Sequence, residues 1–182
     1  MTDSISERNA GACGSSPQAH SKVSVPVKLD YAEERVVELE LGSRVTAVLE
    51  IVAVERGCRV EELVLFREGE GELLTSDLVV DANYPDKCRH HVHYLGEVTV
   101  TAYYQASQQS HVFKRFEAVK DVLAWAIEAF GIDGSLATEL VLVRHGHKDE
   151  LPEREHIGHL TGKDCELALD LVRGDIANGS SS

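Results

Sequence analysis

The chain of 182 residues is poor in cysteine, in basic residues and in long apolar runs. Its four cysteines, Cys13, Cys58, Cys88 and Cys165, are scattered and form no C-x-x-C pair. A disulfide framework is therefore not expected in a reducing compartment. We interpret the four thiols as small buried or incidental side chains.

Basic residues do not balance the acidic ones, because 18 Lys and Arg stand against 31 Asp and Glu, and the net charge is −13. Such a chain repels phosphate groups, so partners among nucleic acids or anionic membranes are not expected. No apolar run approaches the ~20 residues that span a bilayer. The N-terminus also lacks the apolar core of a signal peptide. The expected location is the cytoplasm.

Signatures of catalysis and of metal binding are missing too. The sequence has no G-x-S-x-G elbow and no H-E-x-x-H pattern, so we expect no enzyme, no cofactor and no metal. His91 and His93 form an H-x-H pair on a predicted strand, which would put two imidazoles on the same face. We nevertheless interpret the clustered histidines as solvated loop residues; they are His90, His91, His93, His145, His147, His156 and His159.

What is present is the composition of a globular protein, with 43% apolar and 27% charged residues. A chain of this length is long enough to form two small domains. Residues 1–21 are rich in Ser, Gly and Ala and lack an apolar pattern, which predicts a disordered tail.

From Lys22 onward one pattern occurs twice. Residues 44–57 correspond to residues 118–131, with an offset of 131 − 57 = 74. The short apolar runs around Leu63 and Leu140 correspond with an offset of 140 − 63 = 77. Each unit is predicted to contain two alternating strands, one helix, a short apolar strand, a polar irregular stretch and a final strand. This order indicates an α+β unit with one helix across a mixed sheet.

Particular residues set the predicted element ends. Ser43 is expected to be the N-cap of the first helix and Gly57 its stop. Pro26 predicts an exposed edge or a bulge in the first strand. Trp125 lies off the apolar stripe of the second helix, which leaves three readings open: a partner anchor, a cover for the core edge, or a contact with the first unit.

The second unit contains the run Leu140–Val143, then Leu151, then Ile157, then the strand from Cys165 to Gly174. This order resembles the second half of ubiquitin, and the first unit follows it more loosely, so both units resemble ubiquitin-like β-grasp domains. The resemblance implies two tandem ubiquitin-like domains, at residues 22–96 and 97–174, followed by a flexible C-terminal tail at residues 175–182. The outward positions of the last strand are expected to be Ala168 and Asp170.

A tandem of this kind is similar to the interferon-induced two-domain modifier and, more closely, to the modifiers of bacterial antiphage operons (the Bil type). That resemblance implies a protein modifier used in antiviral defence. Its implied partners are an adenylating activating enzyme, a conjugating enzyme, a metal-dependent deubiquitinase-like peptidase and target proteins, with phage structural proteins among the candidates.

The tail carries the predicted site. The resemblance implies cleavage between Gly179 and Ser180 and conjugation through the Gly179 carboxylate, with Arg173, Gly174 and Asn178 docking the tail. The family ends in a double glycine, whereas this chain has a single glycine after Asn178, and Gly174 is the other candidate terminus. A non-conjugated adaptor and a β-grasp sulfur carrier are the alternative functions.

Overall fold

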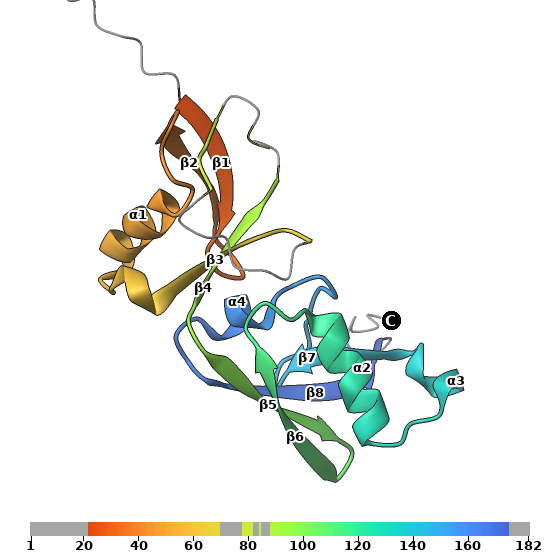
Figure 1. The fold of residues 1–182 in the computed structure, drawn as a ribbon. Helices are drawn as coiled ribbons and strands as arrows, with labels where there is room; N and C mark the ends of the chain where they lie inside the picture. Colours follow the sequence, from red (N-terminus) through yellow and green to blue (C-terminus); the bar gives the residue numbers. More distant parts are fainter. Residues whose placement is uncertain (1–21, 70–77, 82–83, 85–87, 175–182) are drawn as a thin grey trace, which may run out of the picture.

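The computed structural model describes residues 22–69, 78–81, 84 and 88–174, and these residues form two successive domains (Figure 1). Each domain is a four-stranded mixed sheet crossed by one longer helix. The α+β architecture of two tandem β-grasp units, predicted from the repeated pattern, is confirmed. No helix among the described residues is long and apolar enough to cross a membrane.

The first domain has the sheet order β2-β1-β4-β3, in which β1 pairs antiparallel with β2 and parallel with β4. Its core lies between the sheet and α1, where Val48, Val52 and Leu65 are almost completely buried. The elements are β1 (Lys22–Lys28), β2 (Glu34–Glu40), α1 (Ala47–Arg56), the 3-10 turn η1 (Val60–Glu62), β3 (Leu63–Arg67) and β4 (His90–Tyr94).

The second domain repeats this topology with the order β6-β5-β8-β7. The central parallel pair β5–β8 is longer here, with five residue pairs against two for β1–β4. The elements are β5 (Glu97–Tyr104), β6 (Ser107–Lys114), α2 (Val119–Ala129), α3 (Gly134–Ala137), β7 (Leu140–Arg144), α4 (Ile157–Thr161) and β8 (Glu166–Arg173).

Two local predictions were wrong. Ser43 is not the helix N-cap, because α1 begins at Ala47 after Thr46, and the backbone of Ser43 instead bonds Glu40 and Val80. The stretch before β8 is not wholly irregular, because it contains the buried helix α4. The exposed edge predicted at Pro26 agrees with the described ladders, in which β4 pairs with β1 only at Val27 and Lys28.

The predicted stop of α1 is confirmed. Gly57 adopts a left-handed φ of 61°, a conformation that glycine reaches without a steric penalty. In the second unit the helix ends at Ala129, and Gly131 follows with a φ of 63°.

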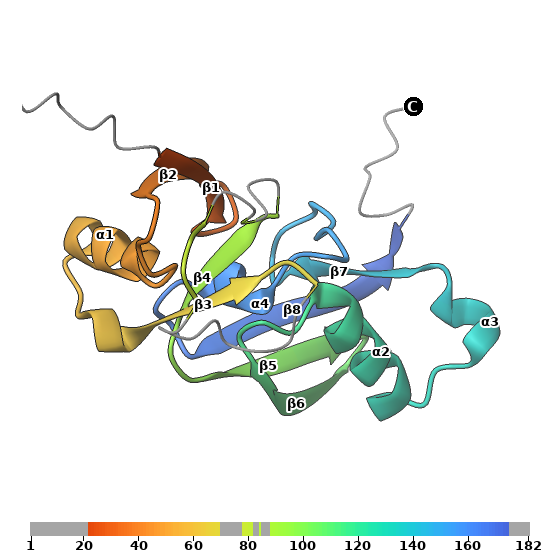
Figure 2. The ribbon, with the colours of Figure 1, turned by 45° about the horizontal axis from the view of Figure 1, so that its top comes forward.

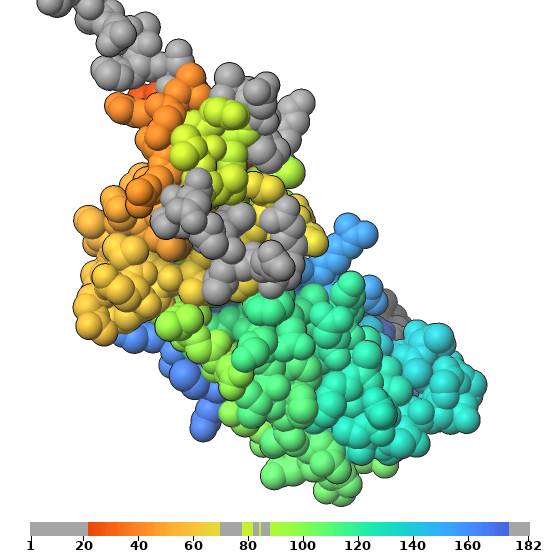
Figure 3. Space-filling model, viewed as in Figure 1, coloured from red at the N-terminus to blue at the C-terminus, as the bar shows by residue number. Residues whose placement is uncertain are grey.

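The two domains lie in direct contact (Figures 2 and 3). Lys28 of β1 forms an ion pair of 2.5 Å with Glu155, and both side chains are largely buried. The backbone N–H of Tyr31 donates to the carbonyl of His159 at 3.2 Å. A ring pair, Phe66 with Phe116, extends the contact, with centroids 4.8 Å apart. The junction is therefore a packed interface with polar and apolar parts.

Candidate functional site

The last strand directs the chain out of the second domain. β8 starts beside β5, at the pair Thr99–Glu166, and runs parallel to it away from the first domain (Figures 1 and 2). At its far end Arg173 pairs with Leu140, and the N–H of Gly174 donates to the carbonyl of Glu139 at 2.9 Å. The tail predicted to carry the chemistry therefore leaves from the end of a central strand.

The predicted tail residues fall into two groups. Arg173 is exposed, and its guanidinium lies 3.7 Å from the carboxylate of Glu139, a pairing that solvent screens. Gly174 is half-buried beside Val141. Residues 175–182, which include the predicted conjugation and processing residues Asn178, Gly179 and Ser180, lie outside the described residues.

The outer face of the second sheet is open and mostly polar. Along β8 the buried side chains of Leu167, Leu169 and Leu171 alternate with outward positions, among them Ala168 and Asp170, as predicted. Asp170 accepts from the backbone of Gly146 and bonds the ring of His145 at 2.7 Å; the hydroxyls of Thr101 and Ser110 lie 2.9 Å apart. This surface suits partners that bring hydrogen bonds and charge.

The outer face of the first sheet is covered over β3 and β4. His90 and Val92 of β4 face the core, where the His90 ring bonds the Tyr84 hydroxyl at 2.7 Å. The opposite face carries His91 and His93, with Phe66 directly beside His91 on β3. These three side chains are at most 5% exposed because the second domain packs over them. Over β2 the same face is exposed, for example at Val36, so part of the first sheet is open as well as the face of the second.

The interpretation of the clustered histidines as solvated was wrong for most of them. His90, His91, His93 and His159 are buried and His156 is half-buried, while His145 and His147 are exposed as predicted. Among the described residues, His91, His93 and His156 could together hold a metal ion, with one ligand atom of each within 4.8 Å of the others. The H-x-H spacing on a strand was the available signal, but the sequence did not show that a second domain covers it.

Burial keeps these imidazoles neutral. Desolvation, with the neighbouring histidines, lowers the pKa of His91 to about 2 and that of His156 to about 4. It also lowers the pKa of His93 well below its usual value, and that of His159 despite the carboxylate of Glu155 at 2.7 Å. At neutral pH each ring is consequently uncharged and carries one nitrogen lone pair.

Two other predictions are resolved by the structure. Trp125 covers the core edge of its own domain, with its ring stacked on His111 and edge-on to Phe113 at centroid distances of 5.5 Å. Cys58, Cys88 and Cys165 are free thiols, and Cys13 lies outside the described residues.

Comparison with known proteins agrees with the geometry of the second domain. Residues 99–174 match the family model of BilA ubiquitin-like domain 2. The match covers the second of the two tandem ubiquitin-like domains. The matched segment ends at Gly174, the last residue that the structure describes.

No curated protein sequence matches the chain. Among solved structures, the Caldiarchaeum subterraneum ubiquitin is 14% identical over 43% of this chain and 94% of its own, with a TM-score of 0.36. The N-terminal ubiquitin-like domain of the 4931431F19Rik protein is 20% identical over 50% and 93%, with a TM-score of 0.35. A chain of a pParkin-pUb-UbcH7 complex is 15% identical over 43% and 23%, with a TM-score of 0.37.

Proposed function

We propose that this chain is a ubiquitin-like protein modifier of antiphage defence that is conjugated through Gly179 and is itself not an enzyme. A partner peptidase removes Ser180 and the residues after it, an activating enzyme adenylates the new carboxylate, and a conjugating enzyme passes it to amines of target proteins in the cytoplasm. The observation that carries the proposal is the BilA-domain match, which ends where β8 releases the tail.

The geometry of β8 favours Gly179 over Gly174 as the mature terminus. Gly174 is tied to the sheet through its bond to the carbonyl of Glu139, so a carboxylate there would stay close to the domain surface. Five further residues give a reach of about 17 Å when extended at ~3.3–3.6 Å per residue. A terminus at Gly179 can therefore enter a confined active site while the folded domain remains outside.

The chemistry explains why a glycine is needed at the end of the tail. A carboxylate is a poor acyl donor at neutral pH, and adenylation by ATP supplies a good leaving group. A cysteine thiolate of the activating enzyme then displaces AMP and forms a thioester, which a target amine attacks. Glycine has no side chain to obstruct either attack.

Maturation is tested by incubating the full chain with the partner peptidase and measuring its intact mass. We expect the loss of three serine residues and nothing more. Cleavage after Gly174 instead would show that the other glycine is the mature terminus.

Conjugation is tested with two glycine variants in the presence of ATP and the partner enzymes. Starting from chains that end at residue 179, we expect Gly179→Val to abolish slower-migrating adducts without changing the fold. Gly134→Ala is the control: an added Cβ there would meet nothing within 4 Å and the residue lies outside the tail, so the variant should fold and still form adducts.

Tail docking by Arg173 has its own test. Because its ion pair with Glu139 is exposed, Arg173→Ala should leave the free energy of unfolding within about 1 kcal/mol of wild type. We expect slower adduct formation from this variant, and an unchanged rate would remove Arg173 from the docking residues.

The adaptor and the sulfur carrier predict different results. If the chain is an adaptor, neither the chain that ends at Gly179 nor its glycine variants form adducts. An adaptor also binds its partners equally well after the tail is removed. A sulfur carrier gives a C-terminal thiocarboxylate, visible by mass, in place of protein adducts.

A further inference from the structure

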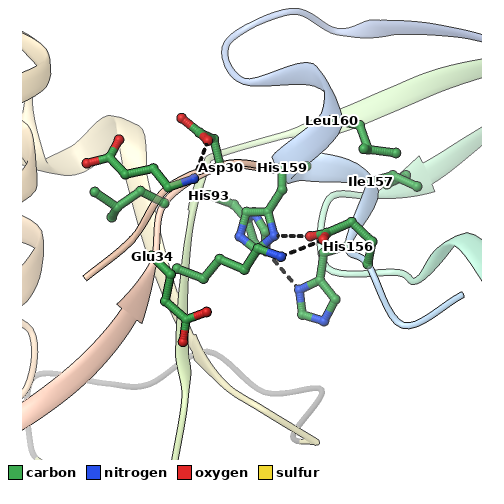
Figure 4. Close-up of polar contacts among 12 residues, drawn as sticks. Asp30, Glu34, His93, His156, Ile157, His159 and Leu160 are labelled. Atoms are coloured by element: carbon green, nitrogen blue, oxygen red, sulfur yellow. Dashed lines mark hydrogen bonds and ion pairs between the residues drawn. The ribbon is translucent and has the colours of Figure 1, made fainter. Parts of the chain in front are cut away.

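Four imidazoles meet where the two domains join, as the close-up of His93, His156 and His159 shows (Figure 4). His91 and His93 come from β4 of the first domain, while His156 and His159 come from the start of α4 in the second. Ring centroids lie 4.2 Å apart for His91 and His156 and 4.3 Å apart for His93 and His159. The two pairs of histidines thus form one compact cluster, although His93 and His156 are 63 positions apart in the chain.

The nitrogen atoms of three of these rings are spaced like the ligands of one ion. Donor atoms of His91, His93 and His156 lie within 4.8 Å of one another, and Nε2 of His93 is 3.0 Å from Nδ1 of His156. A tetrahedral zinc ion with Zn–N bonds of 2.0–2.1 Å holds its ligand nitrogens about 3.3 Å apart. Small ring rotations would bring the three donors to that spacing.

Several of the ring nitrogens are buried without any hydrogen-bond partner. They are both nitrogens of His91, Nδ1 of His93 and Nε2 of His159, in side chains that are 5%, 1% and 3% exposed. Buried polar atoms in native proteins are nearly always paired, so unpartnered atoms concentrated in one cluster require an explanation. An ion that accepts the lone pairs of neutral imidazoles would provide one.

The fourth imidazole is supported as metal ligands usually are. Nδ1 of His159 lies 2.7 Å from a carboxylate oxygen of Glu155, whose other oxygen pairs with Lys28. Ligating histidines typically donate their second N–H to a carboxylate in this way, which fixes the tautomer and leaves Nε2 free. In His159 that Nε2 atom is buried and has no hydrogen-bond partner.

We propose that His91, His93 and His156 bind one Zn²⁺ ion at the domain junction, with His159 as the imidazole available for the fourth position. An all-nitrogen set of neutral imidazoles suits zinc and not the oxygen-preferring Mg²⁺ or Ca²⁺. Because the ligands come from both domains, the ion fixes their relative orientation. This site replaces the sequence-based expectation of no metal.

The test uses the full chain without an affinity tag, stripped with a chelator and then titrated with Zn²⁺ by calorimetry. We expect one ion per chain and a Tm that rises with free Zn²⁺, because the ion binds only the folded state. Co²⁺ in place of Zn²⁺ should give the intense visible absorption of a tetrahedral site. That spectrum is read from the wild-type protein and does not depend on whether a variant folds.

Matched histidine variants locate the site. His91→Gln and His156→Gln each remove a ligand from one domain, and both should lower zinc affinity by more than the about 10–100-fold that loss of an outer-shell partner costs. His147→Gln, at an exposed histidine, should leave the affinity unchanged. The proposal is overturned if the wild type binds no zinc, if its cobalt spectrum is that of the aqueous ion, or if His91→Gln and His147→Gln bind equally.

Discussion

At the scale of single residues, one glycine decides how closely the two domains approach. A Cβ atom on Gly158 would lie 2.7 Å from Nδ1 of His93 and 2.8 Å from the carbonyl oxygen of Arg115. The N–H of Gly158 donates to the same carbonyl at 2.9 Å, which holds α4 against that backbone. The absence of a side chain therefore makes room for an imidazole from the other domain.

We accordingly expect Gly158→Ala to destabilise the protein by about 1–3 kcal/mol, the usual cost of overpacking a well-packed site. Urea unfolding of the full chain measures this change. Gly134→Ala is the control: its added Cβ would meet nothing within 4 Å, so that variant should be neutral or slightly stabilised. Equal stability of the two variants would show that the atoms around Gly158 shift to accommodate the added Cβ.

At the scale of elements, β8 is the strand that links the core of the second domain to the C-terminal residues. It lies between β5 and β7, so both of its edges are paired, and its buried leucines pack beneath α2. This position holds the strand against β5 up to Asp170 and against β7 up to Arg173. It also makes the inward side chains of β8 important to stability.

Leu169 of β8 is fully buried, and Leu169→Ala should cost about 2–5 kcal/mol by removing methyl groups and leaving a cavity. Leu123 of α2 is only partly buried. Leu123→Ala should therefore cost less than Leu169→Ala in the same urea titration. The reverse order would mean that the helix and not the strand anchors this core.

At the scale of the whole molecule, the two domains have separate cores and different roles for their outer sheet faces. The apolar cluster of the second domain lies between Val98 and Leu171 and contains no residue of the first. The second domain covers the outer face of the first sheet over β3 and β4 and leaves it exposed over β2, whereas the outer face of the second sheet is open. Both domains therefore present part of a sheet face to solvent.

The domain boundaries remain a prediction that can be tested directly. A fragment of residues 97–182 should fold alone, with protected amides in β5, β7 and β8 by hydrogen exchange, because its core is complete. Amides of α4 should exchange faster than in the full chain, since the fragment lacks the contacts of His91 and His93. A fragment without protected strands would contradict the boundary at residue 97.

The sequence by itself determined the duplicated order of elements, because alternation along strands and the stripe along each helix depend only on neighbouring residues. The strand from Glu166 to Arg173 and the stop at Gly57 follow from such local patterns. Tertiary structure decided what local patterns do not contain. A proline is tolerated in β1, between β2 and β4, because β4 pairs with this strand only from Val27 onward. The H-x-H pair is buried because α4 covers it. A histidine's environment is set by side chains distant in the chain, so only the folded junction could show that four of them meet.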